Sequence, residues 1–236
     1  MCDASSKKRY RWKRTRQSHQ QRQDPVERAQ KQAELATLQA AAEHGYVCLK
    51  YLDESGFVNW SPVSYSWSLV GTQKRQEQTS QRGKRVSLLG VWEPGIEMTY
   101  GLVTGSVDSE IFIKFINRQA QQAQTKLNRT GAITVIVQDN ASTHTSRLVR
   151  EQLPIWQQQG LYFFQLPKYC SEMNPIEGEW HQLKAHEIRG RMFENTYDLS
   201  MAVIAGMRAR GNHTGHRVNR FNFQTQRLIR SPLLTT

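Results

Sequence analysis

The sequence predicts a mixed α/β fold in which an antiparallel meander of strands is followed by β/α crossovers and flanked by helices. Residues 47–51 and 86–92 carry the apolar pattern of strands, and a Pro-Gly turn at 94–95 joins the second to another apolar segment at 96–103. From residue 109 onward, helical and strand-like segments alternate, as they do in β/α units. A chain of 236 residues has room for one domain of ~150 residues with extensions.

The N-terminal part is predicted to be a basic arm followed by a helix. Residues 7–22 contain eight Lys and Arg, no acidic residue and no aliphatic side chain, so they cannot bury enough surface to fold alone. We expect a flexible arm over residues 1–23. Asp24 and Pro25 then supply an N-cap and a first helical residue, and a glycine ends the Ala- and Leu-rich stretch that follows. Residues 24–45 are therefore predicted to form a linker helix.

The remaining elements follow in order along the chain. The strand that begins at residue 47 is expected to end at an acidic turn within 52–57. The other predicted elements are strands at 65–69, 86–92, 96–103, 133–137 and 161–165, and helices at 109–128, at 146–159 and from residue 175. Residues 201–236 contain six arginines and no acidic residue, and we interpret them as a basic C-terminal tail. A central domain over residues 46–200 remains.

Composition and charge exclude several classes of protein. The chain is 38% hydrophobic and 22% charged, and no apolar run approaches the ~20 residues of a membrane helix. Its 32 Lys and Arg against 20 Asp and Glu give a net charge of +12, which favours polyanionic partners, most often nucleic acid. Cys2, Cys48 and Cys170 are scattered without CxxC spacing. A disulfide framework and a cysteine zinc site are therefore not expected, and a reducing compartment fits best.

Three acidic residues are candidates for a metal site. Asp53 and Asp139 each follow the last apolar residue of a predicted strand, and strand ends of α/β sheets are where ligands gather. Glu177 falls in the first turn of a helix that Asn174 can cap and Pro175 can begin. Three neighbouring carboxylates repel one another unless cations intervene, and hard oxygen ligands favour Mg²⁺ or Mn²⁺. Two such ions ~3.5–4 Å apart can activate a water or a 3′-hydroxyl for phosphodiester chemistry.

Each of these acids also has a structural interpretation. Asp53 and Asp139 could be turn residues after strands, and Glu177 stands three positions after Asn174, which is the spacing of a capping box. Spacing alone therefore leaves the choice between a metal site and local structure open.

The sequence segments around the three acids resemble motifs of a known family. LDESGF at 52–57, QDNASTH at 138–144 and SEMNPIEGEW at 171–180 occur in this order. They are similar to the motifs that carry the catalytic Asp, Asp and Glu of the mariner-like DDE transposases, in the bacterial insertion-sequence branch (insertion sequence 630 group). That resemblance covers about residues 46–188. It implies a ribonuclease H-like fold and a catalytic triad of Asp53, Asp139 and Glu177.

The resemblance further implies what the protein does. It implies two Mg²⁺ ions, with Mn²⁺ as a substitute, hydrolysis at transposon ends, and attack of the freed 3′-hydroxyl on target DNA in a cut-and-paste reaction at TA dinucleotides. The expected partners are double-stranded DNA and a second copy of the chain in an active homodimer, and the expected location is the bacterial cytoplasm, at the nucleoid. A ribonuclease H-like nuclease without strand transfer and an inactive nucleic-acid-binding remnant are the alternatives.

Members of the family begin with helix-turn-helix modules that read the transposon ends, and this chain starts near where those modules would finish. We expect it to be the catalytic part without them. A frame-split gene, an isolated catalytic domain and a decayed element are open explanations. The activity of the isolated chain is open for the same reason.

Polar neighbours of the triad are weaker candidates. Asn140 and His144 could orient a phosphate or a metal-bound water, although helix capping explains Asn140 equally well. Glu54 is expected to point to the opposite side of its strand from Asp53, and Glu179 to face solvent. The residues predicted to contact DNA lie in the basic arm and in the basic loop: Lys7, Lys8, Arg9, Arg11, Lys13, Arg14, Lys74, Arg75, Arg82, Lys84 and Arg85.

Overall fold

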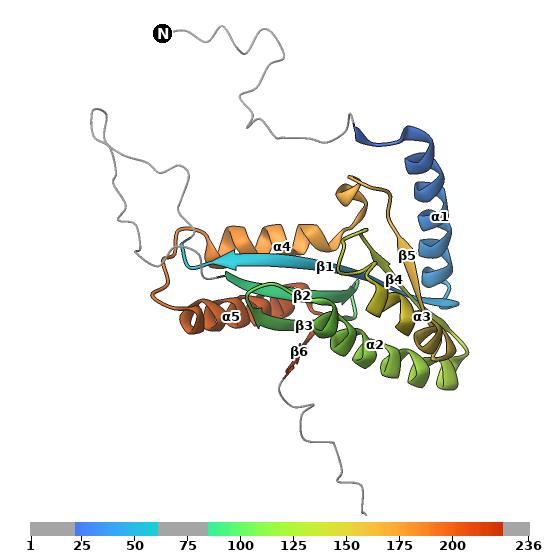
Figure 1. Ribbon diagram of the computed structural model, residues 1–236. Helices are drawn as coiled ribbons and strands as arrows, with labels where there is room; N and C mark the ends of the chain where they lie inside the picture. Colours follow the sequence, from blue (N-terminus) through green and yellow to red (C-terminus); the bar gives the residue numbers. More distant parts are fainter. Residues whose placement is uncertain (1–21, 61–84, 224–236) are drawn as a thin grey trace, which may run out of the picture.

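A computed structural model describes residues 22–60 and 85–223 of the chain. Its centre is a six-stranded sheet with the strand order β5-β4-β1-β2-β3-β6 (Figure 1). The strands are β1 (Val47–Val58), β2 (Arg85–Glu93), β3 (Glu97–Thr104), β4 (Ile133–Gln138), β5 (Leu161–Gln165) and β6 (Arg217–Phe221). The helices are α1 (Pro25–Glu43), α2 (Ser109–Thr130), α3 (Arg147–Gln158), α4 (Ile176–Leu183) and α5 (Thr196–Thr214), with short turns η3 (Ser171–Met173) and η4 (Lys184–Ile188).

The sheet is mixed, as the sequence predicts. Strands β1, β2 and β3 form an antiparallel meander, which turns at Gly95 with a φ of 72°. Strands β4 and β5 then add in parallel on the other side of β1, and β6 adds in parallel to β3. Antiparallel neighbours need only a tight turn, whereas each parallel neighbour needs a crossover, which α2, α3 and α5 contribute to.

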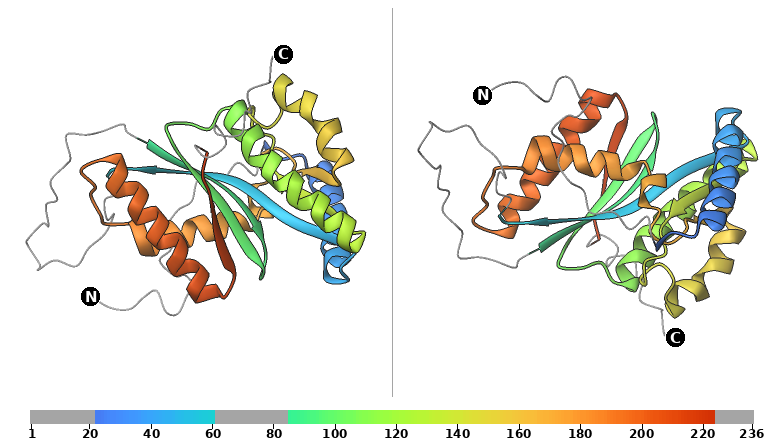
Figure 2. Two further views of the ribbon diagram at one scale, coloured as in Figure 1. Left: turned by 90° about the horizontal axis from the view of Figure 1, so that it is seen from below. Right: turned by 90° about the horizontal axis from the view of Figure 1, so that it is seen from above.

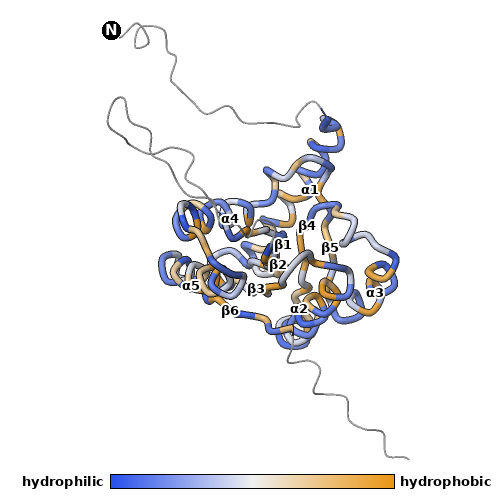
Figure 3. The backbone as a smooth tube through the Cα atoms, turned by 60° about the vertical axis from the view of Figure 1, so that its left-hand side comes forward, coloured by the Kyte–Doolittle hydropathy of each residue, from blue (hydrophilic) through white to orange (hydrophobic). Residues whose placement is uncertain are grey.

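Helices cover both faces of the sheet (Figure 2), and two apolar clusters result. Odd-numbered β1 residues such as Tyr51 pack with α1, α4 and α5, while even-numbered ones such as Leu52 pack with α2 and α3. The strands are accordingly the most apolar part of the chain, and the helices are apolar only in part (Figure 3).

Helix α1 begins where the sequence predicts. Asp24 caps it by accepting from the backbone N–H groups of Val26 and Glu27, and Gly45 lies beyond its end with a φ of 77°. The predicted linker helix also packs on the domain, because Leu35 is buried against the sheet and Arg28 forms an ion pair with Glu172 at 3.3 Å. The helix is thus docked on the domain.

Two sequence predictions about this architecture need correction. Strand β1 continues through the expected acidic turn to Val58, because residues 53–58 pair with β2. The expected boundary at residue 200 falls inside α5, and residues up to 221 belong to the folded domain, because Val203 and Met207 are buried in its core and β6 completes the sheet. The predicted strand at 65–69 and most of the basic loop lie outside the described residues.

The ladder between β1 and β2 leaves room for an aromatic ring. Gly90 of β2 is opposite Asp53 in the register, and a Cβ atom on Gly90 would lie 2.5 Å from Cη2 of Trp180 in α4. The indole therefore occupies the place where any other residue would carry its side chain, which brings α4 directly onto the sheet beside Asp53.

Gly90→Ala is expected to lower the free energy of unfolding by about 1–3 kcal/mol, because Trp180 must move to accept the new methyl group. Urea denaturation measures the change. Gly178→Ala is the matched control, since nothing lies within 4 Å of its added Cβ and alanine favours a helix. Equal destabilisation by both variants would contradict the close approach of Trp180.

Candidate active site

The pairing of β1 with β4 brings the two aspartates together. Tyr51 and Val137 form the last pair of this parallel ladder, and Asp53 and Asp139 each lie two residues further along. Beyond this point β4 ends at Gln138, whereas β1 continues alongside β2. Asp139 therefore stands in the loop that leaves the sheet beside Asp53, which is the geometry that the sequence predicts from the two strand ends.

Helix α4 carries the third carboxylate, Glu177, in its first turn. The sequence gives Asn174 the role of helix cap, and this is wrong: the helix has no side-chain cap, and the Asn174 amide instead donates to the carbonyl oxygen of Leu52 at 2.9 Å. Asn174 is only 4% exposed. The bond ties the start of α4 to the residue before Asp53, so it fixes two of the three acids relative to each other.

The three carboxylates influence one another electrostatically. The pKa of Asp53 is raised to about 7, chiefly by burial and further by the charges of Glu177 and Asp139, against opposing hydrogen bonds from the Glu54 backbone and Trp180. Burial also raises the pKa of Glu177, which a hydrogen bond from Ser171 partly opposes and the charge of Asp139 reinforces. The site therefore holds more negative charge than its protein surroundings neutralise.

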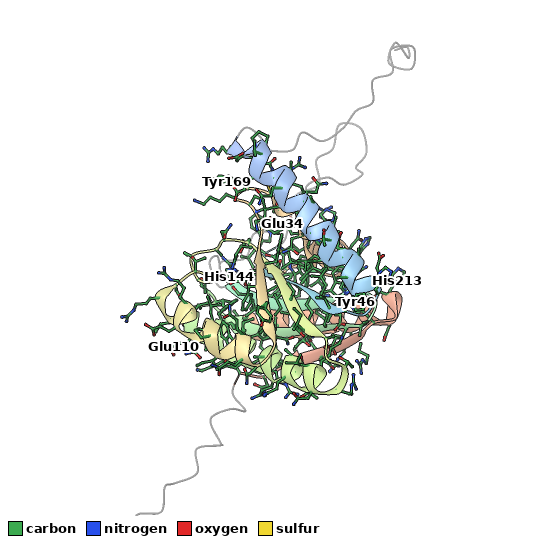
Figure 4. All side chains as sticks on the ribbon, turned by 90° about the vertical axis from the view of Figure 1, so that its right-hand side faces the viewer. Glu34, Tyr46, Glu110, His144, Tyr169 and His213 are labelled. Carbon is green, nitrogen blue, oxygen red and sulfur yellow. The ribbon has the colours of Figure 1, made fainter. Side chains whose placement is uncertain are left out.

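His144 contacts the carboxylate of Asp139. Its ring is 4% exposed, stacks on Phe112 with centroids 4.6 Å apart, and brings Nδ1 to 2.9 Å from Oδ1 of Asp139. Nε2 lies 3.6 Å from Glu54, which points away from Asp53 as predicted. Burial alone would lower the pKa of His144, but the two carboxylates raise it to about 9. Figure 4 shows His144 beside the strands and next to α3.

This imidazolium fixes the charge state of Asp139. The hydrogen bond from His144 holds the pKa of Asp139 below its usual value, so Asp139 stays ionised while Asp53 does not at mildly acidic pH. We interpret His144 as a positioning residue for Asp139. Its predicted role in orienting a phosphate or water is untested.

Asn140 ties two loops together and caps no helix. Its amide donates to the carbonyl oxygen of Leu166, and the backbone N–H of Leu166 donates back to Gln138 at 2.9 Å. Helix α3 is capped by Ser146. The capping interpretation of Asn140 is therefore wrong, and its side chain fixes the loop that carries Asp139.

Glu179 is also placed differently from the prediction. It does not face solvent but forms a 2.7 Å ion pair with Arg210 of α5, with both side chains 15% exposed. The reason is that α5, which the sequence analysis assigned in part to a tail, packs against α4. The pair holds these two helices together and lies outside the carboxylate group.

Lys184 lies near Asp53 and is not among the site residues predicted from the sequence. It follows Glu177 by two helical turns, and its ammonium lies 5.3 Å from the ring centroid of Phe57. Desolvation lowers its pKa, and the charge of Asp53 opposes that shift. The spacing of seven residues from Glu177 is a signal that could have found it, because such residues share one helix face.

The DNA contacts predicted from the sequence lie mostly outside the described residues. This holds for Lys7, Lys8, Arg9, Arg11, Lys13, Arg14, Lys74, Arg75, Arg82 and Lys84. Arg85 is described, and its guanidinium lies over Gly56, where a Cβ would be 2.6 Å from Arg85 Nε. Arg85 is also close enough to contribute to the lowered pKa of Lys184.

Within residues 22–60 and 85–223, no three His, Cys, Asp or Glu side chains lie together as a ready-made metal site. The charges of Glu177 and Asp139 nevertheless reach Asp53 and help to raise its pKa. No helix in the same ranges is long and apolar enough to cross a bilayer.

Comparison with known proteins identifies the family. Residues 48–200 match the model of the DDE superfamily endonucleases, and the chain belongs to that family. The match contains Asp53, Asp139 and Glu177. No curated protein matches the chain.

Several solved structures of similar fold are structures of the Mos1 transposase. The Mos1 mariner paired-end complex with Mn has a TM-score of 0.68 and 15% identity, covering 89% of this chain and 63% of that one. A pre-cleavage Mos1 transpososome has a TM-score of 0.63 and 16% identity, and the match covers 88% of this chain and 64% of that one. The Mos1 catalytic domain has a TM-score of 0.57 and 14% identity, and the match covers 86% of this chain and 88% of that one. The predicted ribonuclease H-like fold class is confirmed, and this chain spans less than two thirds of the Mos1 chain in these two complexes.

Asn174→Ala is expected to cost about 1–3 kcal/mol of stability, because it removes a buried side-chain hydrogen bond to the Leu52 carbonyl oxygen. Chemical denaturation measures this, and Mn²⁺ titration of the folded variant should show weaker binding because Glu177 loses its anchor. Asn128→Ala, at an exposed position of α2, should stay within ~0.5 kcal/mol of the parent. A stable Asn174→Ala protein would refute the anchoring role.

The raised pKa of Asp53 gives a pH dependence with a definite sign. The folded protein binds a proton at Asp53 up to about pH 7, whereas the unfolded chain releases it near 3.8. The contribution of Asp53 to metal-free stability therefore falls as pH rises through this window. Thermal melts in EDTA should show a steeper slope in the parent than in Asp53→Asn, in which Glu177, whose pKa is also raised, still contributes a slope of the same sign.

Proposed function

We propose that this chain is the catalytic domain of a DDE transposase of the mariner-like insertion-sequence type. The observation that carries the proposal is the convergence of Asp53, Asp139 and Glu177, two from the ends of paired parallel strands and one from an anchored helix. Membership of the DDE endonuclease family supports it. The Mos1 structures of similar fold include paired-end and strand-transfer complexes of that protein.

The residues present suit divalent metal ions. Three carboxylates share a space in which burial and mutual repulsion raise the pKa of Asp53, and hard cations relieve both effects. Oxygen ligands select Mg²⁺ or Mn²⁺, and Mos1 structures contain Mg or Mn. We assign Asp53, Asp139 and Glu177 as the ligands of two such ions. Bound there, the ions would activate the attacking oxygen and stabilise the leaving one.

The protein's own groups would prepare the site for this chemistry. His144 keeps Asp139 ionised and oriented, and Asn174 fixes Glu177 against β1. Lys184 and Arg85 supply positive charge on the side of Asp53 and would hold phosphates of the cleaved strand. Lys184 and Arg85 lie on helix and strand backbone, and His144 and Asn174 are fixed by their contacts with Asp139 and Leu52, so little rearrangement is needed when DNA arrives.

The reaction has two balanced steps. Water attacks the phosphorus at a transposon end, which breaks the P–O3′ bond and leaves a 3′-hydroxyl and a 5′-phosphate. That hydroxyl then attacks a target phosphodiester, forms a new P–O bond and releases a target 3′-hydroxyl. The proposed partner is double-stranded DNA. We propose that the active protein is a homodimer, because two ends must be cut together. We also propose a cut-and-paste outcome at TA targets and a location at the bacterial nucleoid.

A ribonuclease H-like nuclease would share the first step and lack the second. Product analysis separates the two functions, because only a transposase joins the cut end to a second duplex. An inactive remnant would do neither while still binding nucleic acid.

Asp139→Asn and Glu177→Gln are expected to lose Mn²⁺ binding and to cut DNA more than ~100-fold more slowly, since even indirect metal partners contribute 10- to 100-fold. Calorimetry measures the metal and a nicking assay measures cleavage, and circular dichroism checks the fold. Glu151→Gln on exposed α3 is the control and should match the parent. Unchanged Mn²⁺ binding in both triad variants would remove them from the metal site.

A further inference from the structure

The indole of Trp180 fills a place beside Asp53 where the sheet has no side chain. Asp53 and Gly90 are opposite each other in the β1–β2 ladder, and residues paired in this way lie on one face of the sheet. Asp53 is on the face that α4 covers, because Tyr51, two residues earlier, packs there with Trp180. A Cβ atom on Gly90 would lie 2.5 Å from Cη2 and 2.7 Å from Cζ2 of the indole. The ring therefore occupies the position of the missing cross-strand neighbour of Asp53.

The indole nitrogen is the polar atom of this ring, and it is buried. Trp180 is 4% exposed, and its Nε1 completes no hydrogen bond of standard geometry with any described residue. The acceptor on which it acts at longer range is the Asp53 carboxylate, whose pKa the indole N–H helps to hold down against burial. Leaving a buried donor without a full partner is unfavourable. The apolar contacts of the ring therefore do not account for its N–H group.

Helix α4 brings the indole and a second carboxylate to the same place. Glu177 and Trp180 are three residues apart in α4, so they lie on one side of the helix. The start of the helix is fixed by the bond from Asn174 to Leu52, the residue before Asp53. The indole is thus held at Asp53 by the same contact that holds Glu177 there.

Asp53 has acceptor capacity for both a metal and a protein donor. A carboxylate has two oxygens with about four lone-pair sites, and a metal-ligating carboxylate commonly accepts a hydrogen bond from the protein as well. In the described part of the chain, the groups that donate toward Asp53 are the backbone N–H of Glu54 and the indole of Trp180. Trp180 is therefore the side chain that is placed to orient this carboxylate.

We propose that Trp180 is a positioning residue for Asp53, and that its indole N–H donates to the carboxylate oxygen that the metal ions leave free. This inference rests on the proposed function, because it needs Asp53 to be a metal ligand. It adds to that function a residue outside the triad and outside the site residues predicted from the sequence. Partners of this kind are commonly worth about 10- to 100-fold in metal affinity.

The test removes the N–H group in two ways and measures Mn²⁺ binding by calorimetry. Trp180→Phe removes the N–H and part of the ring. Replacement of Trp180 by β-(3-benzothienyl)alanine keeps the fused rings and puts sulfur in place of the N–H, so the packing against Gly90 is retained. Both changes should weaken Mn²⁺ binding about tenfold or more. Circular dichroism checks that each variant is folded.

Trp156→Phe is the matched control. Trp156 is fully buried in α3 and belongs to the apolar cluster on the other face of the sheet. Its indole donates to Asn117 at 2.7 Å, so the same substitution removes the same atoms together with a complete hydrogen bond. This variant should lose stability in urea and keep its Mn²⁺ affinity within about twofold of the parent, because it shares no partner with the triad.

A measurement without metal tests the contact itself. In EDTA, at a pH above the Asp53 pKa of about 7, Asp53→Asn should move the indole proton resonance of Trp180 upfield, because the charged acceptor is lost. Absence of this resonance in Trp180→Phe assigns it. The resonance of Trp156 should not move, since its acceptor is Asn117. An unmoved Trp180 resonance would overturn the inference.

The metal titrations separate this inference from the proposed function. Unchanged Mn²⁺ binding in Asp139→Asn and Glu177→Gln would overturn both. If these two variants lose Mn²⁺ while both Trp180 variants bind it within about twofold of the parent, the proposed function stands and the positioning role is wrong. Loss in Trp180→Phe but not in the benzothienyl variant would also contradict that role, since the volume of the ring and not its N–H would then matter.

Discussion

The parallel pairing of β1 with β4 is the constraint on which the candidate site depends. Because the ladder ends at Tyr51 and Val137, the two aspartates that follow these residues must leave it side by side. Strand β1 continues along β2 and β4 does not, so Asp53 is fixed within the sheet and Asp139 is held by the loop behind it. The backbone register thus brings like charges together, and burial then raises the pKa of Asp53.

Helix α4 joins this arrangement through contacts that are unusually direct. Asn174 bonds to the strand residue before Asp53, and Trp180 occupies the space above Gly90. Further along, α5 is joined to α4 by the partly buried ion pair of Arg210 and Glu179. The position of Glu177 therefore follows from packing along the whole of α4, and the segment after residue 200 contributes to it.

The sheet has different chemistry at its two ends. One end gathers carboxylates and holds one of them with an imidazolium, which favours cations. At the other end, Lys50 and Lys126 form ion pairs with Glu93, so the charges there are compensated within the protein. Strand β1 connects the two ends, and Lys50 and Asp53 lie on its opposite faces.

The sequence by itself determined the order of elements, the start of α1 at Asp24, and the three acids, because apolar periodicity, capping residues and local motifs are properties of neighbouring residues. Only the tertiary structure decided that β1 runs past Asp53, that Asn174 anchors rather than caps, that Glu179 pairs with Arg210 of α5, and that Lys184 stands beside the site. These facts depend on which segments pair across long stretches of chain. A hydrogen bond to a partner 122 residues away leaves no periodic signal in the sequence.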